Sequence, residues 1–442
     1  MQAFNTSRAT ALLSILAVLQ FALFLGYFPF SIIVTPYGDV LDWLNEFYNL
    51  PDHNLWPYLW VPHNGHRILF TKLLMVGDVT LFGGLSYPIA WVCMFALLIA
   101  AAITLFAVWR SVEHRDARRW ATAVTALLLF PTSSYASFAY PVNSQHLLVC
   151  FFVFMTCVLF ARAGVMRERM LERNVYFFLA LIAAVCASLT SLNGLMSWPL
   201  LVWMAWALRL GRNFVFASAA LGVLAMMGFS YHYPLASEAA ASISGLGYIG
   251  HIVKYLIEYH AMPWVEIGPL YWPAMGLGLV VFLLSIIFSV KGVLATRAQP
   301  PIAVVAVAML MFSLATAVMI AIGRHQMDLL PAHRYSMFLL ITLVSLFVLN
   351  IPRFERWMSS RQGRSMVMSA TLVMALGYLG QQVVVGQFAI QRAQAFVQYE
   401  KEIMAGGRDP KATTALYFPS VEILEERYRM LEKQRIYMFR PQ

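Results

Sequence analysis

Histidine and arginine side chains gather in the segment PHNGHR, residues 62–67, in a pattern suited to binding an anion. His63, His66 and Arg67 place two imidazoles and a guanidinium close together, and a guanidinium presents planar, bidentate donors that match phosphate. The histidines could also help to hold a metal, but two histidines three residues apart are a weak signal without a defined carboxylate partner. We expect either a phosphate-binding cluster or an interfacial turn whose imidazoles meet lipid headgroups.

A second cluster occupies the segment GRHQMDLLPAHRY, residues 323–335. Arg324 and Arg334 each stand at the end of an apolar stretch, and His333 and Tyr335 flank Arg334. A guanidinium at the edge of hydrocarbon is costly unless it reaches the interface or binds an anion. The segment therefore predicts a site for a lipid-linked phosphate or pyrophosphate, with simple snorkelling to the interface as the alternative.

Asp39 is the first acidic residue of the chain and begins the stretch DVLDWLNEFYNL, residues 39–50. Apolar residues recur there at helical spacing, which predicts an amphipathic helix on the membrane surface. A second surface helix is expected to begin near His66, with Arg67 and Lys72 at its polar edge. Asp39 either takes part in chemistry or interacts with the positive, N-terminal end of the surface helix that it begins.

Membrane-spanning helices are the elements that must position these residues. The 442-residue chain is 60% hydrophobic and 12% charged, whereas a soluble domain carries about 25% charged residues. Roughly 20 apolar residues cross the hydrocarbon, and they do so as a helix because every backbone polar group must be satisfied internally. About eleven such stretches occur, near 9–34, 86–109, 120–139, 144–163, 175–191, 194–210, 214–232, 270–290, 301–322, 335–351 and 366–388. The expected fold is an all-α polytopic membrane protein whose first span is retained rather than cleaved as a signal peptide.

Charge is distributed unevenly between the two sets of loops. Alternate loops, beginning with the N-terminus, carry a net charge of +12, the other set carries −4 and the tail +2, which together make the net +10 of the chain. Because cytoplasmic loops hold the excess of Lys and Arg, the N-terminus is predicted inside and the C-terminal tail outside. The basic balance is thus a topological signal and does not indicate nucleic-acid binding. The histidines expected at the outer face are His53, His63, His66, His146, His232, His251, His260, His325 and His333.

Two regions are expected, a transmembrane domain over residues 1–388 and a C-terminal amphipathic tail over residues 389–442. The first outer loop, about residues 35–85, is long for a connection between two spans. The tail is charged and contains the helical pattern VEILEERYRMLEKQR. We expect the tail to pack over the outer face or on lipid headgroups.

The long first outer loop, the acid just beyond the first span and the surface helices together resemble the GT-C superfamily. Its members are integral-membrane glycosyltransferases that use polyprenyl-phosphate sugars. The short elements HNGHR, NGLMSWP and GR…HRY also resemble blocks of uncharacterised bacterial members. The chain departs from that pattern at Gly65, where the resemblance leads us to expect an acid.

The resemblance implies a function at the outer face of the bacterial inner membrane. Asp39 would be the general base on the acceptor hydroxyl, and Arg324 and Arg334 would stabilise charge on the departing lipid phosphate. The side chains that would share the second task are His66, Arg67 and His333. The partners would be a polyprenyl-phosphate sugar donor and a glycan, lipid or protein acceptor, with inversion of the anomeric centre. Some members use a divalent metal, and the sequence leaves that possibility open for this chain.

Other classes fit part of this pattern. An O-antigen polymerase or ligase also acts on polyprenyl carriers, but such enzymes usually place their arginines and histidines in large later loops. In this chain the candidate residues are concentrated in the first outer loop. A transporter or flippase predicts ionisable residues near mid-span and broken helices, and the predicted span interiors are nearly free of charge. A non-enzymatic scaffold would leave the clustered histidines and arginines without a role.

Overall fold

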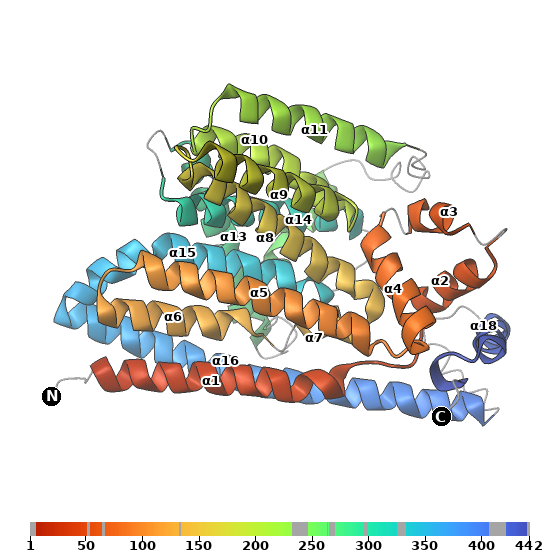
Figure 1. Ribbon diagram of the computed structural model, residues 1–442. Coiled ribbons are helices and arrows are strands. Elements are labelled where there is room, and N and C mark those ends of the chain that lie inside the picture. The colour runs from red at the N-terminus through yellow and green to blue at the C-terminus, as the bar shows by residue number, and fades with distance from the viewer. Residues whose placement is uncertain are drawn as a thin grey trace.

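The computed structural model describes residues 6–50, 54–63, 67–131, 134–231, 246–262, 264, 270–295, 299–324, 333–405 and 421–439. This part of the chain is helical, with no β-strand. Nine of its helices are long and apolar enough to cross a membrane, which confirms the predicted polytopic helical class. They are α1 (Thr6–Ser31), α5 (Tyr87–Ser111), α8 (Ser144–Val165), α9 (Met170–Ser188), α11 (Arg212–Ser230), α13 (Tyr271–Val293), α14 (Pro301–Arg324), α15 (Ser336–Ser359) and α16 (Arg361–Met404). Figure 1 shows them side by side in one bundle.

Two of the predicted spans fall on shorter helices, α6 (Arg115–Leu129) and α10 (Ser197–Ala207), of 15 and 11 residues. The chain leaves α6 through Phe130 and Pro131 and continues as α7 (Tyr135–Ala139) and the 3₁₀ turn η3 (Pro141–Asn143). A 3₁₀ segment, η4 (Leu192–Met196), precedes α10. Both helices are shorter than the roughly 20 residues of a full span, so eleven crossings stay a prediction.

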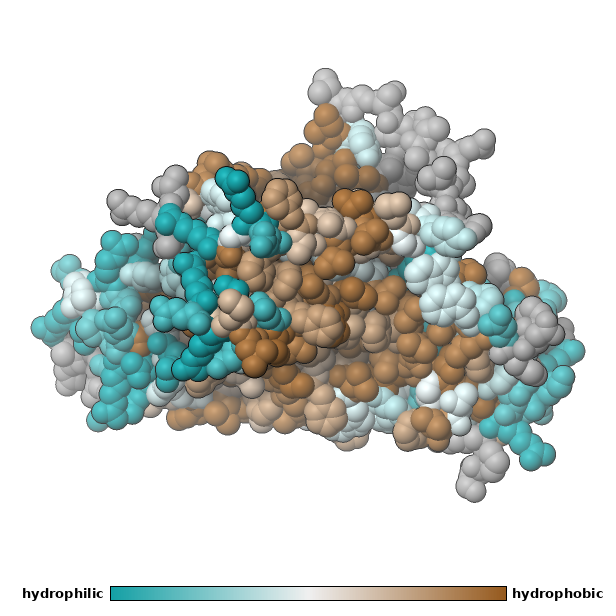
Figure 2. Space-filling view, turned by 45° about the horizontal axis from the view of Figure 1, so that its top comes forward, coloured by the Kyte–Doolittle hydropathy of each residue, from teal (hydrophilic) through white to brown (hydrophobic). Residues whose placement is uncertain are grey.

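Apolar side chains form the interior of the bundle and also cover its flanks. The largest buried cluster draws on α1, α5, α8, α10, α14 and α15. Large apolar residues such as Phe178, Leu224 and Leu283 are nevertheless exposed, as expected where helices face lipid instead of water. Figure 2 shows this apolar surface as a broad zone between hydrophilic residues at the two ends of the molecule.

A group of short helices sits at one end of the bundle, and we call it the cap. It consists of α2 (Asp39–Tyr48), α3 (Leu55–Trp60), α4 (Leu69–Phe82), α18 (Val421–Gln434) and the 3₁₀ turn η9 (Tyr437–Phe439). The predicted amphipathic helix is therefore present as α2, with Val40, Leu41 and Leu44 buried. These residues share a second hydrophobic core with Leu431 and Tyr437 of the tail. The first loop and the C-terminal tail thus fold together.

Helix α16 carries the chain from the bundle into the cap. Its 44 residues span about 66 Å, about twice the hydrocarbon thickness of a bilayer. In Figure 1 it runs beside α1 and continues past the end of that helix. There the ring of Phe396 lies 4.3 Å from the ring of Tyr37, and both side chains belong to the core of the cap.

The end of the tail closes against the turn that follows α4. Gly83 and Gly84 have positive φ angles of 69° and 79°, and the backbone N–H of Tyr437 donates to the carbonyl of Gly83 at 2.7 Å. A Cβ on Gly84 would lie 2.6 Å from the ring of Tyr437. Glycine is therefore required at position 84 by its backbone conformation and by the ring packed on it.

Candidate functional site

Asp39 stands at the first turn of α2, at the boundary between the bundle and the cap. Gly38 before it has a φ of 49° and is the N-cap residue, so the chain turns sharply into the helix. The carboxylate of Asp39 faces the positive end of the α2 dipole, and its side chain keeps 43% of its surface exposed. An acid in this position is both electrostatically favoured and open to solvent.

His63 links Asp39 to the core of the cap. Its Nε2 lies 3.2 Å from Oδ2 of Asp39, and its Nδ1 lies 2.7 Å from Nε1 of Trp43, which donates the hydrogen bond. Since the indole can only donate, Nδ1 of His63 must accept, and a neutral ring then carries its hydrogen on Nε2. Nε2 is the ring nitrogen that lies beside the Asp39 carboxylate.

Tyr140 holds the chain on either side of Asp39. Its hydroxyl donates to the carbonyl of Tyr37 and accepts from the backbone N–H of Val40 at 3.3 Å, while its ring stacks on Tyr37 at 4.0 Å. Burial raises the pKa of Tyr140 well above its ordinary value, so the phenol keeps the proton that this double role requires. The position of Asp39 is thus determined partly by a residue far along the chain.

Arg334 lies in the 3₁₀ turn η8 (His333–Tyr335), which packs against α7. Ser137 of α7 donates to the carbonyl of Arg334 at 3.3 Å, and the ring of Tyr135 is 5.7 Å from that of His333. Nε of Arg334 is buried and has no hydrogen-bond partner among the described residues. The segment before Asp39 also contacts α7, since the backbone N–H of Ile33 donates to the carbonyl of Ala139 at 3.0 Å. Within the described residues, no hydrogen bond or ion pair joins Asp39 to Arg334.

Arg67 and Lys72 are buried, so their predicted place at the polar edge of a surface helix was wrong. Arg67 donates to the backbone carbonyls of Trp60 and Tyr231 and lies over the ring of Trp60 at 4.4 Å. Lys72 donates to the carbonyl of Tyr58 at 2.8 Å. Carbonyl oxygens and aromatic faces replace the water that these cations lose. A phosphate could reach Arg67 only if its carbonyl bonds opened.

The remaining predicted site residues are placed only in part. Arg324 is the last residue of α14, and its side chain lies outside the described part of the structure, as does the whole of His66. Tyr335 is buried in η8, with its ring 5.3 Å from that of His146. Within the described residues, no three His, Cys, Asp or Glu side chains are grouped so that they could hold a metal ion.

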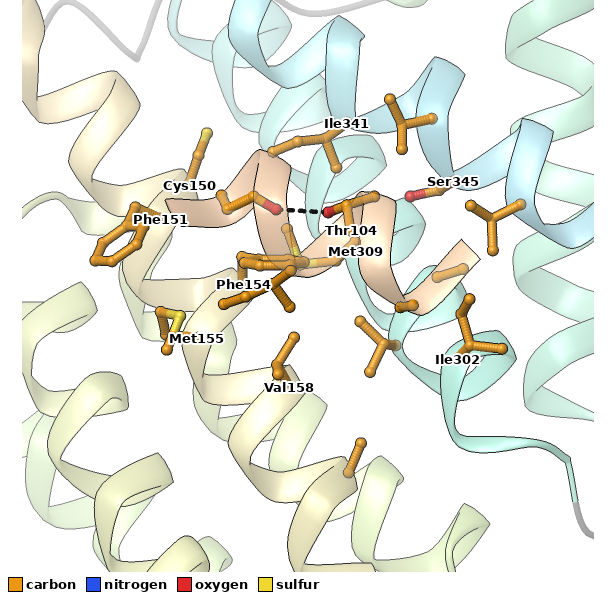
Figure 3. Close-up of a pocket in the computed structure, with 18 of the residues that line it drawn as sticks. Thr104, Cys150, Phe151, Phe154, Met155, Val158, Ile302, Met309, Ile341 and Ser345 are labelled. Atoms are coloured by element: carbon orange, nitrogen blue, oxygen red, sulfur yellow. Dashed lines mark hydrogen bonds between the residues drawn. The ribbon is translucent and has the colours of Figure 1, made fainter. Parts of the chain in front are cut away.

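An apolar groove of about 740 Å³ runs between α5, α8, α14 and α15. Its walls reach from Leu147 and Met337, near η8, to Arg110 and Arg162 at the other end of the helices. Figure 3 shows its aliphatic, aromatic and sulfur-bearing lining, where the hydroxyl of Thr104 is turned back onto its own helix. The groove has the volume and the apolar lining to hold a hydrocarbon chain.

Several of these features were not predicted. Trp43 stands four residues after Asp39 on α2 and so faces the same side of the helix, a signal that was available. Tyr140 and the groove gave no local signal, because they depend on helices far apart in the sequence. No protein-family model, curated protein or solved structure matches the chain.

Proposed function

We propose that the protein is a membrane glycosyltransferase that moves a sugar from a polyprenyl-phosphate donor to a glycan, lipid or protein acceptor. The observation that carries this proposal is the half-exposed Asp39 carboxylate, oriented by His63 and Trp43 where the cap meets the bundle. A fixed carboxylate open on one side is what base catalysis on an incoming hydroxyl requires.

In the proposed reaction, Asp39 accepts the proton and polyprenyl phosphate is the leaving group. Asp39 takes the proton of the acceptor hydroxyl while its oxygen attacks the anomeric carbon. The bond between that carbon and the phosphate oxygen breaks, and polyprenyl phosphate leaves with the electron pair. Attack opposite the leaving group inverts the anomeric centre.

Arg334 is the proposed partner of the departing phosphate. Its buried Nε lacks a hydrogen-bond partner among the described residues, and a guanidinium facing a developing phosphate charge lowers the barrier. His333 lies beside it in η8. In this proposal His63 orients the base, while Arg324, His66 and Arg67 are further candidates for contacts to the phosphate.

The apolar groove supports a lipid-linked donor. Met337 at one end of the groove follows Arg334 by one helical turn, and Leu147 is next to His146, whose ring meets that of Tyr335. An isoprenoid chain lying in the groove would therefore bring its phosphate to η8. The proposed topology has eleven crossings in the bacterial inner membrane, the N-terminus in the cytoplasm and the cap outside.

Purified protein, a synthetic polyprenyl-phosphate sugar with a labelled sugar, and a fraction of envelope acceptors test the proposal. We expect labelled acceptor and free polyprenyl phosphate in equal amounts. Arg334→Ala and Arg334→Lys should both lower the transfer rate by about 100-fold, because lysine lacks the bidentate fork. A donor that crosses vesicle membranes intact, with its sugar still attached, would instead identify a flippase. Full activity of Arg334→Lys would show that Arg334 does not bind the phosphate through a bidentate guanidinium and only extends to the membrane interface.

A further inference from the structure

The segment that carries Asp39 is held by the distant end of α16. The hydroxyl of Thr35 donates to Oε2 of Glu400 at 2.5 Å and lies 3.4 Å from the carbonyl of Phe396. Thr35 itself is buried. The chain leaving α1 is therefore bound to the C-terminal end of α16.

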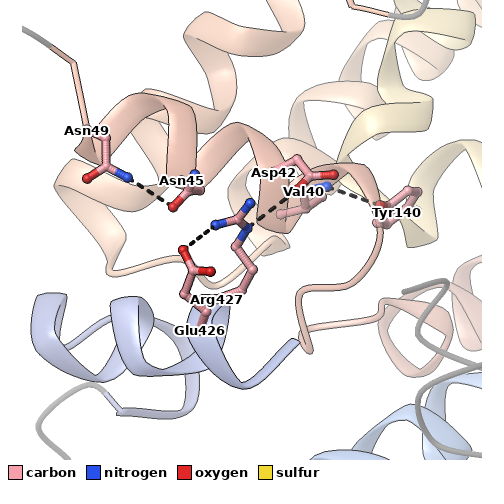
Figure 4. Close-up of polar contacts among 7 residues, drawn as sticks. All are labelled: Val40, Asp42, Asn45, Asn49, Tyr140, Glu426 and Arg427. Carbon is pink, nitrogen blue, oxygen red and sulfur yellow. Dashed lines mark hydrogen bonds and ion pairs between the residues drawn. The ribbon is translucent and has the colours of Figure 1, made fainter. Parts of the chain in front are cut away.

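Helix α18 contacts the same segment from the side of the cap. Nε of Arg427 lies 3.5 Å from Oδ1 of Asp42, as Figure 4 shows. The next residue, Tyr428, is buried and donates to the carbonyl of Pro36 at 3.5 Å. The contacts of α18 thus fall on both sides of Asp39, three residues before it and three after it.

Apolar burial keeps α18 in place. Leu424, Leu431 and Tyr437 are buried in the core of the cap, whereas the ion pair of Arg427 is half-exposed and adds little stability by itself. The end of the tail is fastened to the turn after α4 by the hydrogen bond between Tyr437 and Gly83. The tail is therefore packed along the whole described length of α18 and η9.

The segment between α1 and α2 needs such support. It has no regular secondary structure from residue 32 to residue 38, and it contains Gly38 with its positive φ. A reacting group on a short irregular segment keeps its geometry only if neighbouring residues fix it. A displacement of about 1 Å can cost about 100-fold in rate.

We propose that the end of α16 and helix α18 form a clamp that positions Asp39. The clamp contacts the chain at Thr35, Pro36 and Asp42. The proposal rests on the proposed function of Asp39 and goes beyond it, since it makes the C-terminal tail part of the active site. Tyr428 and Glu400 are positioning residues and do not touch substrate.

Two variants and a matched control test the clamp in the full-length protein. Tyr428→Ala removes the buried ring that packs α18 on residues 36–42. Thr35→Val keeps the shape of the side chain and removes the hydroxyl that binds Glu400. We expect kcat for sugar transfer to fall by about 10- to 100-fold with KM for the donor unchanged. Arg429→Ala changes an arginine that is 78% exposed on the same helix, and it should leave both constants as they are.

A second measurement does not depend on activity. In an Asp39→Cys variant, the rate of labelling by an impermeant maleimide reports how freely position 39 moves. The native cysteines contribute little background, because three of them are buried in the bundle and the fourth is half-buried. Adding Tyr428→Ala should raise the labelling rate at least fivefold, and adding Arg429→Ala should not.

The outcomes separate the two proposals. Labelling that is unchanged by Tyr428→Ala would overturn the clamp, as would an unchanged kcat in a variant whose tail has become sensitive to protease. A wild-type protein that transfers no sugar would overturn the proposed function, and the labelling rates would still decide whether the tail positions residue 39.

Discussion

Trp43 determines which nitrogen of His63 carries the hydrogen. The indole donates to Nδ1 at 2.7 Å, so a ring protonated on that nitrogen would set two donors against each other. In a neutral His63 the hydrogen is therefore on Nε2, the nitrogen that lies 3.2 Å from Oδ2 of Asp39. Trp43 thus acts on the proposed base through one intervening side chain.

Trp43→Phe should lower sugar transfer by about 10-fold or more with the protein still folded. Phenylalanine keeps a buried aromatic ring but cannot donate, so His63 is free to turn or to change its tautomer. The rate is measured at saturating donor on purified protein. Trp56→Phe is the control, since Trp56 lies in the cap but is 59% exposed. Equal rates for Trp43→Phe and wild type would show that the indole does not orient the histidine.

Lys72 should make the stability of the cap depend on alkaline pH. Burial lowers its pKa from 10.5 to about 8, so between these values the folded protein loses a proton that the unfolded chain retains. Stability contributed by this residue therefore rises with pH across that window, by about 3 kcal/mol at most. The melting temperature of purified protein between pH 8 and pH 10 measures this rise. It should be absent in Lys72→Met, and an equal rise in both proteins would assign it to other groups.

At the scale of the element, α16 depends on close contact with α1. A Cβ on Gly386 would lie 2.4 Å from the ring of Tyr27, so the two helices approach closely only because position 386 has no side chain. Small residues at such contacts are typical of helix pairs in membranes. This contact fixes the direction in which α16 leaves the bundle, and with it the position of the clamp.

Gly386→Leu should force α1 and α16 apart and lower the melting temperature by several degrees, with loss of transfer activity. Gly377→Leu is the matched control on the same helix, because a Cβ at position 377 would meet nothing within 4 Å. Thermal unfolding of the two variants in the same detergent makes the comparison. Equal melting temperatures would mean that the close approach is not needed.

The sequence predicted these elements unevenly. Periodic apolar residues were sufficient for α2 and for the nine long helices. They overestimated the length of the helix at 120–139, which ends at Leu129 before Pro131, and they misplaced Lys72 and Arg67. Arg67 donates a hydrogen bond to the carbonyl of Tyr231, which is more than 160 residues away in the sequence. A contact of this kind cannot be predicted from the spacing of neighbouring residues. The contact of Trp43 with His63 depends likewise on how α2 and α3 fold back on each other.

At the scale of the whole molecule, the predicted excess of positive charge and the Asp39 carboxylate lie at opposite ends. Arg110 and Arg162 stand in the last turns of α5 and α8, at the end of the groove away from η8. They belong to the set of residues with the predicted net charge of +12, whereas Asp39 belongs to the set with −4. Since positive loops stay in the cytoplasm, the cap is expected outside. That side is where envelope acceptors would be found.

Impermeant maleimide labelling of intact cells checks this orientation. A Glu46→Cys variant in the cap should be labelled directly, and Glu113→Cys and Arg169→Cys variants should be labelled only after the membrane is opened. The same side for positions 113 and 169 is required if α6 and α8 enter and leave the membrane as predicted. Labelling of position 113 in intact cells, with position 46 protected, would invert the topology and remove an outer-face function.

The most direct test of the central claim is the rate of sugar transfer by Asp39→Asn. Asparagine keeps the size of the side chain and can still meet His63, but it cannot take a proton from the acceptor hydroxyl. With purified protein, labelled polyprenyl-phosphate sugar and equal amounts of folded enzyme, we expect transfer to fall by about 1,000-fold, with donor binding retained. Transfer by Asp39→Asn at the wild-type rate would contradict the account.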